Sequence, residues 1–195
     1  GDNMKNFLPF PGETFGQIIN DPDLPRKPKI TYSELIDSMP SDWSKEDLGA
    51  SSDGTTHLYG YSYGDLSDSK PIIFIQGSIH GSEWQTSIWL RHFMEAISNP
   101  SKYQVPKLFY QLKTKFNFYF IPALNASNWG VSRRNANGVD LNRNFPEYWE
   151  ESTSSDKGSS AGSEPETQIV MNKVQNLKPY VFIDLHTDNS SSTTY

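Results

Sequence analysis

Three short runs of apolar residues constrain the fold of this chain more than any other feature. They lie at 71–76, 116–121 and 180–185. Each run is continuous rather than alternating, which is typical of strands that are covered on both faces. Between the first two runs the apolar residues take helical spacing, up to Pro100. This order of strands and helices predicts an α/β fold with a mixed, largely parallel sheet and helices on both faces.

Local patterns mark further elements. Thr31–Glu34 and Ser163–Glu166 both have the spacing of a capping box, which predicts that a helix begins at each. Alternating aromatic residues at 56–62 predict another strand. Prolines and glycines interrupt residues 1–29, so we expect a proline-rich N-terminal arm there, followed by a domain over 30–195.

The composition excludes several classes of function. The 17 Lys and Arg residues are outnumbered by 23 Asp and Glu, so we expect no nucleic-acid partner. The apolar runs are too short to span a bilayer, so we expect no membrane insertion. The chain has no cysteine, and any metal site must therefore use His and carboxylates. The compartment stays open, although this composition favours an extracellular, cell-envelope or virion setting.

Two of the four histidines lie where α/β sheets bind ligands. His80 and His186 follow directly after predicted strands, and open α/β sheets bind ligands beyond the carboxyl ends of their strands. Glu83 stands three positions after His80, so its carboxylate can converge with the imidazole. Two imidazoles and a carboxylate suit zinc and leave a fourth position for water. His57 and His92 are expected to be ordinary surface or core histidines.

A second polar cluster, residues 132–146, holds three arginines in an otherwise acidic chain. Asn142 and Arg143 place an amide beside a guanidinium fork, a combination that suits a planar carboxylate ligand. The alternative is a solvated loop in which Asp140 pairs with the arginines of its own segment.

Together and in this order, these segments resemble the funnelin-type zinc carboxypeptidase family. Gly77–Trp84 resembles the family's first ligand motif, and Gly138–Phe145 resembles its Asp-x-Asn-Arg motif. Ser163–Thr167 resembles the helix start that precedes the last ligand strand, and Phe182–His186 resembles that strand. The resemblance runs from about Ile30 to the last residue.

The resemblance implies a role for each matching residue. Three residues would be the ligands of Zn²⁺: His80, Glu83 and His186. Asp140 would orient the imidazole of His80. Arg133, or Arg134 in its place, would polarise the scissile carbonyl and stabilise the oxyanion. Two residues would bind the free C-terminal carboxylate of a peptide substrate: Asn142 and Arg143.

The sequence departs from the family at two points. Ser82 stands where the digestive members carry an arginine, so digestive specificity is not expected. The family's general base is a glutamate well downstream of the last histidine, and no residue after His186 matches it. Asp184 is assigned to a buried strand, and Asp188 is too close to a ligand in sequence. We therefore expect the zinc-binding half of a peptidase, within a larger parent chain.

Three functions are compatible with these patterns. The first is a zinc metallopeptidase that hydrolyses C-terminal peptide bonds, with cell-wall peptides as plausible substrates. The second is a non-catalytic metal-binding or peptide-binding module of a larger envelope or virion protein. The third is an aspartoacylase-type amidohydrolase, against which Trp84 and the Ser163–Thr167 segment both argue. The first is favoured here.

Overall fold

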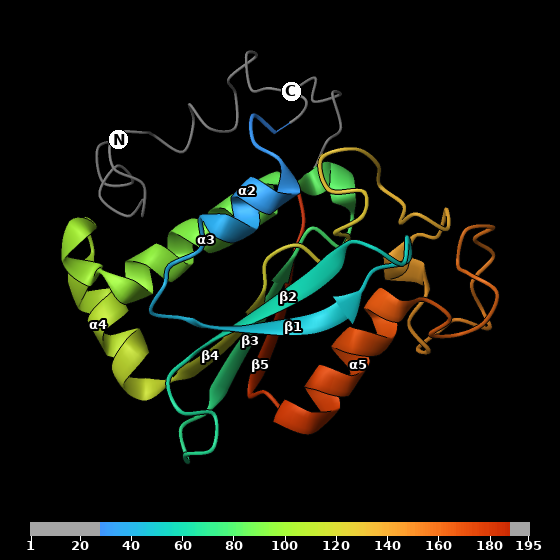
Figure 1. Cartoon of the computed structure of the whole chain (residues 1–195). Coiled ribbons are helices and arrows are strands. Elements are labelled where there is room, and N and C mark those ends of the chain that lie inside the picture. Colours follow the sequence, from blue (N-terminus) through green and yellow to red (C-terminus); the bar gives the residue numbers. More distant parts are fainter. Residues whose placement is uncertain (1–27, 188–195) are drawn as a thin grey trace, which may run out of the picture.

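The computed structural model describes residues 28–187 (Figure 1), so nearly all of the arm expected at 1–29 lies outside the described residues. The described part contains the following strands: β1 (Ser44–Ala50), β2 (His57–Tyr63), β3 (Ile72–Gly77), β4 (Asn117–Ile121) and β5 (Val181–Leu185). Its α-helices are α2 (Tyr32–Asp37), α3 (Gln85–Ser98), α4 (Pro106–Lys115) and α5 (Pro165–Leu177). Short 3₁₀ helices cover Gly81–Glu83, Pro100–Lys102 and Leu141–Arg143. No described helix is both long and apolar enough to cross a membrane.

The strands form one mixed sheet in the order β1-β2-β4-β3-β5. β3 is parallel to both β4 and β5, whereas β2 is antiparallel to β1 and to β4. The three apolar runs thus form the parallel part of the sheet, and the predicted fold class is confirmed. β1 was not predicted, because Ser44–Ala50 is polar and contains three charged residues. It is held at the sheet edge by pairing with β2.

Strand β4 shows why the sheet has a core on each face. Phe118 and Phe120 point to one face, where they pack with buried apolar residues of α3 and α4. Tyr119 and Ile121 point to the other face, where their cluster includes Val170 of α5. Burying each such side chain contributes about 1.5–3 kcal/mol. Figure 1 shows α3 and α4 on one side of the sheet and α5 on the other. The predicted helices on both faces are thus confirmed, although α4 itself was not predicted.

Strand β5 differs from the fully buried strand that its sequence predicted. Phe182 is 42% exposed and Ile183 is 37% exposed. In the described residues β5 pairs with β3 on one side only and forms an edge of the sheet. The continuous apolar run therefore predicted the position of the strand correctly, but it did not predict how far other elements bury it.

The two predicted capping boxes have different outcomes. At α2, the Thr31 side chain accepts a hydrogen bond from the backbone of Glu34, and the Glu34 carboxylate accepts one from the backbone of Thr31, which confirms the box. At α5, the capping box is wrong, because the N-cap is Glu164 and makes no capping bond. The Glu164 carboxylate instead accepts hydrogen bonds from Asn135 and Asn137 at 2.7 and 2.8 Å. The Glu166 carboxylate, which the predicted box directed to Ser163, accepts hydrogen bonds from Ser51 and Asn135.

Candidate metal centre

Three potential metal ligands converge at the carboxyl ends of two neighbouring strands. His80 follows β3, His186 follows β5, and Glu83 lies on the 3₁₀ helix between β3 and α3. Because β3 and β5 are parallel neighbours, their ends bring the two histidines to the same edge of the sheet. Each of the three residues offers one donor atom, and these atoms lie within 4.8 Å of one another. The sequence-predicted set is thus brought together.

The turn after β3 depends on a close backbone approach. A Cβ atom at Gly81 would lie 2.2 Å from the carbonyl oxygen of Asn128 and 2.6 Å from that of Ser132. No L side chain fits there, so the glycine between His80 and Glu83 lets the turn pack against the loop that leads to Arg133. This packing brings the ligand turn and the arginine-containing segment together.

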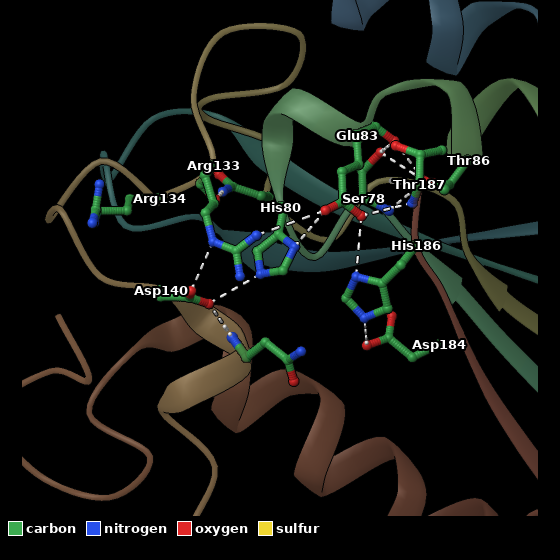
Figure 2. A network of polar contacts seen from close by, with 12 residues as sticks. Ser78, His80, Glu83, Thr86, Arg133, Arg134, Asp140, Asp184, His186 and Thr187 are labelled. Atoms are coloured by element: carbon green, nitrogen blue, oxygen red, sulfur yellow. Dashed lines mark hydrogen bonds and ion pairs between the residues drawn. The ribbon is translucent and has the colours of Figure 1, made fainter. Parts of the chain in front are cut away.

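Both histidines direct the same ring nitrogen to the Glu83 carboxylate (Figure 2). Nδ1 of His80 lies 2.8 Å from Oε1 of Glu83, and Nδ1 of His186 lies 3.0 Å from Oε2. The backbone N–H of Thr187 also donates to Oε2, at 3.0 Å. His80 and Glu83 are buried, while His186 remains partly accessible. Two imidazole nitrogens and one carboxylate form the donor set that zinc prefers, so these residues fit a zinc ion.

The opposite ring nitrogens also have carboxylate partners. Nε2 of His80 lies 3.0 Å from Asp140, as expected for a residue that orients this imidazole. Nε2 of His186 lies 3.0 Å from Asp184, a contact that sequence reasoning missed. A signal for it was present, because residues two positions apart on a strand lie on the same face. The assignment of Asp184 to the strand interior concealed it.

The charges of the centre follow from these contacts. Burial disfavours the charged form of His80, but hydrogen bonds to Asp140 and Glu83 outweigh burial and raise the pKa of His80 to about 9. Burial likewise opposes ionisation of Glu83 and Asp140, yet contact with His80 lowers the pKa of both carboxyls. At Asp184 the balance is reversed: burial raises its pKa, and the attraction of His186 offsets this only in part.

The structure separates the two adjacent arginines. Nε of Arg133 donates to Asp140 at 2.9 Å, and its Nη1 lies 3.8 Å from Glu83. Arg134 turns away and donates to Asp156 at 2.7 Å. Figure 2 shows Arg133 beside His80 and Arg134 pointing out of the centre. Of the two candidates, only Arg133 is close enough to act on a group bound at the metal centre.

The predicted carboxylate-binding pair borders a cavity next to the centre. This cavity has a volume of about 550 Å³, and its lining includes Asn142, Arg143 and Asp184. Nη1 of Arg143 donates to the carbonyl oxygen of Asn142 at 3.0 Å, and both side chains are exposed. Through Asp184, the cavity adjoins His186. A ligand in it can therefore contact the pair and Asp184, the carboxylate partner of His186.

The remaining histidines lie elsewhere, as expected. Nδ1 of His57 pairs with Asp47 on the exposed surface, at 2.8 Å. His92 lies on α3, with its Nδ1 3.3 Å from Glu95. Within residues 28–187, neither belongs to a group of His and carboxylate side chains that could hold a metal ion.

Comparison with known proteins identifies the family. The zinc carboxypeptidase family matches residues 32–194. Carboxypeptidase B of Astacus astacus is 30% identical over 171 residues, which make up 74% of this chain and 54% of that protein. The chain spans about half the length of the curated relatives it matches.

Solved structures share the fold. Carboxypeptidase A from Helicoverpa armigera superposes with a TM-score of 0.62 at 22% identity, over 82% of this chain and 44% of that one. Murein-tripeptide amidase from Escherichia coli O157 gives a TM-score of 0.54 at 24% identity, over 76% of this chain and 62% of that one. At these identities the likeness concerns the fold alone. The match over most of the sequence shows that this chain belongs to the zinc carboxypeptidase family.

Proposed function

We propose that this chain provides the zinc site and the carboxylate-binding residues of a peptidase that hydrolyses C-terminal peptide bonds. The observation that carries this proposal is the convergence of His80, Glu83 and His186 next to Arg133. Membership of a zinc-dependent hydrolase family supports it.

The ligands would be Nδ1 of His80, Nδ1 of His186 and the Glu83 carboxylate. Zinc in such a site polarises a carbonyl and lowers the pKa of water, which supplies a nucleophile at neutral pH. Asp140 lies within hydrogen-bond distance of Nε2 of His80, and by accepting the Nε2 proton it would leave the Nδ1 lone pair free to bind the ion.

Arg133 is placed to act on the substrate carbonyl. Its side chain is 45% exposed, although its Nε is anchored to the buried Asp140. The anchored guanidinium therefore keeps N–H groups available to a bound substrate. A fixed cationic donor of this kind stabilises the negative charge that develops on the carbonyl oxygen.

Asn142 and Arg143 would recognise the terminal carboxylate and thereby restrict cleavage to the last peptide bond. We expect the zinc-loaded chain to bind a peptide with a free C-terminus roughly 10- to 100-fold more tightly than the same peptide amidated, since hydrogen bonds to charged groups contribute about 1.5–3 kcal/mol. Arg143→Ala should remove this preference, and Arg134→Ala should leave it unchanged. Calorimetry measures the affinity for the peptide acid and for the peptide amide. Equal affinities would contradict the proposed role of Asn142 and Arg143.

We infer that no carboxylate of the described site serves as the general base. Glu83 is a proposed ligand, and Asp140 and Asp184 each contact a histidine. We therefore expect the zinc-loaded chain of 195 residues to hydrolyse peptides about 10²–10⁴-fold more slowly than a longer polypeptide that adds the base. Rates of both forms on one set of peptides test this, and equal rates would place the base within these residues.

The same assays distinguish the proposed function from the two alternative functions. A non-catalytic binding module would bind zinc and peptide acids but cleave nothing in either form. An aspartoacylase-type amidohydrolase would prefer acylated amino acids to peptides, and the match to the peptidase family argues against it. Cell-wall peptides belong in the substrate set as one proposed class, because a murein-tripeptide amidase shares the fold.

A further inference from the structure

We infer that Asp184 is a positioning residue that fixes the ring of His186 so that Nδ1 faces the metal. The inference rests on the proposed zinc site and adds to it a residue that the sequence motifs did not assign. Asp184 would thus act on His186 in the same way that Asp140 acts on His80.

The two pairs have the same geometry. In each, a carboxylate oxygen lies 3.0 Å from Nε2, and Nδ1 of the same ring faces Glu83. A ring that donates its Nε2 proton to a carboxylate keeps a lone pair on Nδ1, the nitrogen that can bind a metal. Both rings are therefore set to offer Nδ1 to the same point.

The other described histidines do not share this pattern. At His57 the carboxylate of Asp47 contacts Nδ1, and at His92 the carboxylate of Glu95 lies nearest to Nδ1. Pairing a carboxylate with Nε2 thus distinguishes the two proposed ligands from the two surface histidines.

The surroundings of Asp184 favour a role toward His186 over a role in stability. The side chain is only 21% exposed, and its Oδ1 is buried without a hydrogen-bond partner in the described structure. A partly desolvated carboxylate with one unpaired oxygen costs free energy. Asp140, by contrast, is also held by Arg133 and by the backbone N–H of Asn142. Among the described residues Asp184 has no arginine or backbone partner of this kind; its carboxylate is bonded to His186, with the side chain of Gln76 as a further hydrogen-bonding neighbour.

Strand geometry explains how the contact is enforced. Asp184 and His186 are two positions apart, so their side chains emerge on the same face of the chain. The register of β5 against β3, in which Asp184 pairs with Gln76, fixes the position of the carboxylate. The position of His186 is thereby fixed relative to the sheet.

The test separates metal binding from stability. Asp184→Leu removes the acceptor but keeps a side chain of similar size on a partly buried strand. We expect this variant to bind Zn²⁺ roughly 10- to 100-fold more weakly than the wild type, with no loss of stability to urea. Asp184→Asn, whose amide oxygen still accepts a hydrogen bond from Nε2, should recover most of the affinity. Asp47→Leu is the matched control, since it breaks the surface pair with His57, and it should leave the zinc affinity unchanged.

Competition with a chelator measures the zinc affinity, and ¹⁵N NMR of the wild type identifies which nitrogen of His186 is protonated. Protonation at Nε2 with zinc on Nδ1 supports the inference even if a variant fails to fold. Zinc on Nε2, or wild-type affinity in Asp184→Leu, would overturn it while leaving the zinc site intact. A wild type that binds no zinc would overturn the proposed function and this inference together.

Discussion

Replacing His80 by alanine should abolish stoichiometric zinc binding. His80 is buried and places Nδ1 2.8 Å from the Glu83 carboxylate, so its replacement removes one of the three donors in the described metal-binding group. Loss of a residue that only orients a ligand typically costs about 10- to 100-fold in metal affinity. Loss of the ligand itself should therefore exceed 100-fold. Titration of the metal-free protein with zinc in the presence of a competing chelator measures the change.

His57→Ala is the control for this experiment. His57 also pairs with a carboxylate, that of Asp47, but it lies on the exposed surface away from the centre. Its replacement should leave one zinc per chain at unchanged affinity. If His80→Ala bound zinc as tightly as His57→Ala, the donor set proposed here would be wrong.

Glu166→Ala should have the largest effect on stability. Its carboxylate is fully buried and accepts hydrogen bonds from the hydroxyl of Ser51 at 2.6 Å, the backbone N–H of Ser52 at 2.8 Å and the amide of Asn135 at 3.3 Å. Each donor left unsatisfied costs about 1–3 kcal/mol. We expect the free energy of unfolding to fall by about 3–5 kcal/mol. Urea unfolding measures this loss.

Glu150→Ala provides the comparison, because Glu150 is exposed. It should change the free energy of unfolding by no more than about 0.5 kcal/mol. Equal stability of Glu166→Ala and Glu150→Ala would show that the buried network does not hold α5 to the segment carrying Asn135.

The parallel part of the fold could be predicted because its strands are apolar throughout, whichever residues cover them. β3 and β4 are largely buried between helices on both faces, and their positions were predicted to within one residue. β1 could not be predicted, since its polar residues form a strand only through pairing with β2. The exposure of Phe182 depends on which elements cover β5, and no local pattern records that.

The site likewise contains residues that could be predicted from the sequence and residues that could not. His80, Glu83 and His186 were identifiable because strand ends and short spacings bring side chains together predictably. The choice between Arg133 and Arg134 was not, because adjacent residues differ only in tertiary partners, here Asp140 and Asp156.

Helix caps also depend on tertiary partners that the local sequence does not show. The Ser163–Glu166 capping box was wrong because the Glu166 carboxylate accepts hydrogen bonds from Ser51, Ser52 and Asn135 instead of from the backbone of Ser163. Local bonds can be inferred from spacing only where no distant partner offers a better one. The contact of Asp184 with His186 was missed for a different reason: its spacing of two residues allows it, but Asp184 was assigned to the interior of a buried strand.

Crystals of the protein grown with zinc, with anomalous diffraction collected at the zinc edge, would show whether the three proposed ligands bind the ion. We expect a single strong peak among His80, Glu83 and His186, about 2.0–2.2 Å from Nδ1 of each histidine and from the Glu83 carboxylate. A peak elsewhere, or no ordered zinc at these three residues, would contradict it.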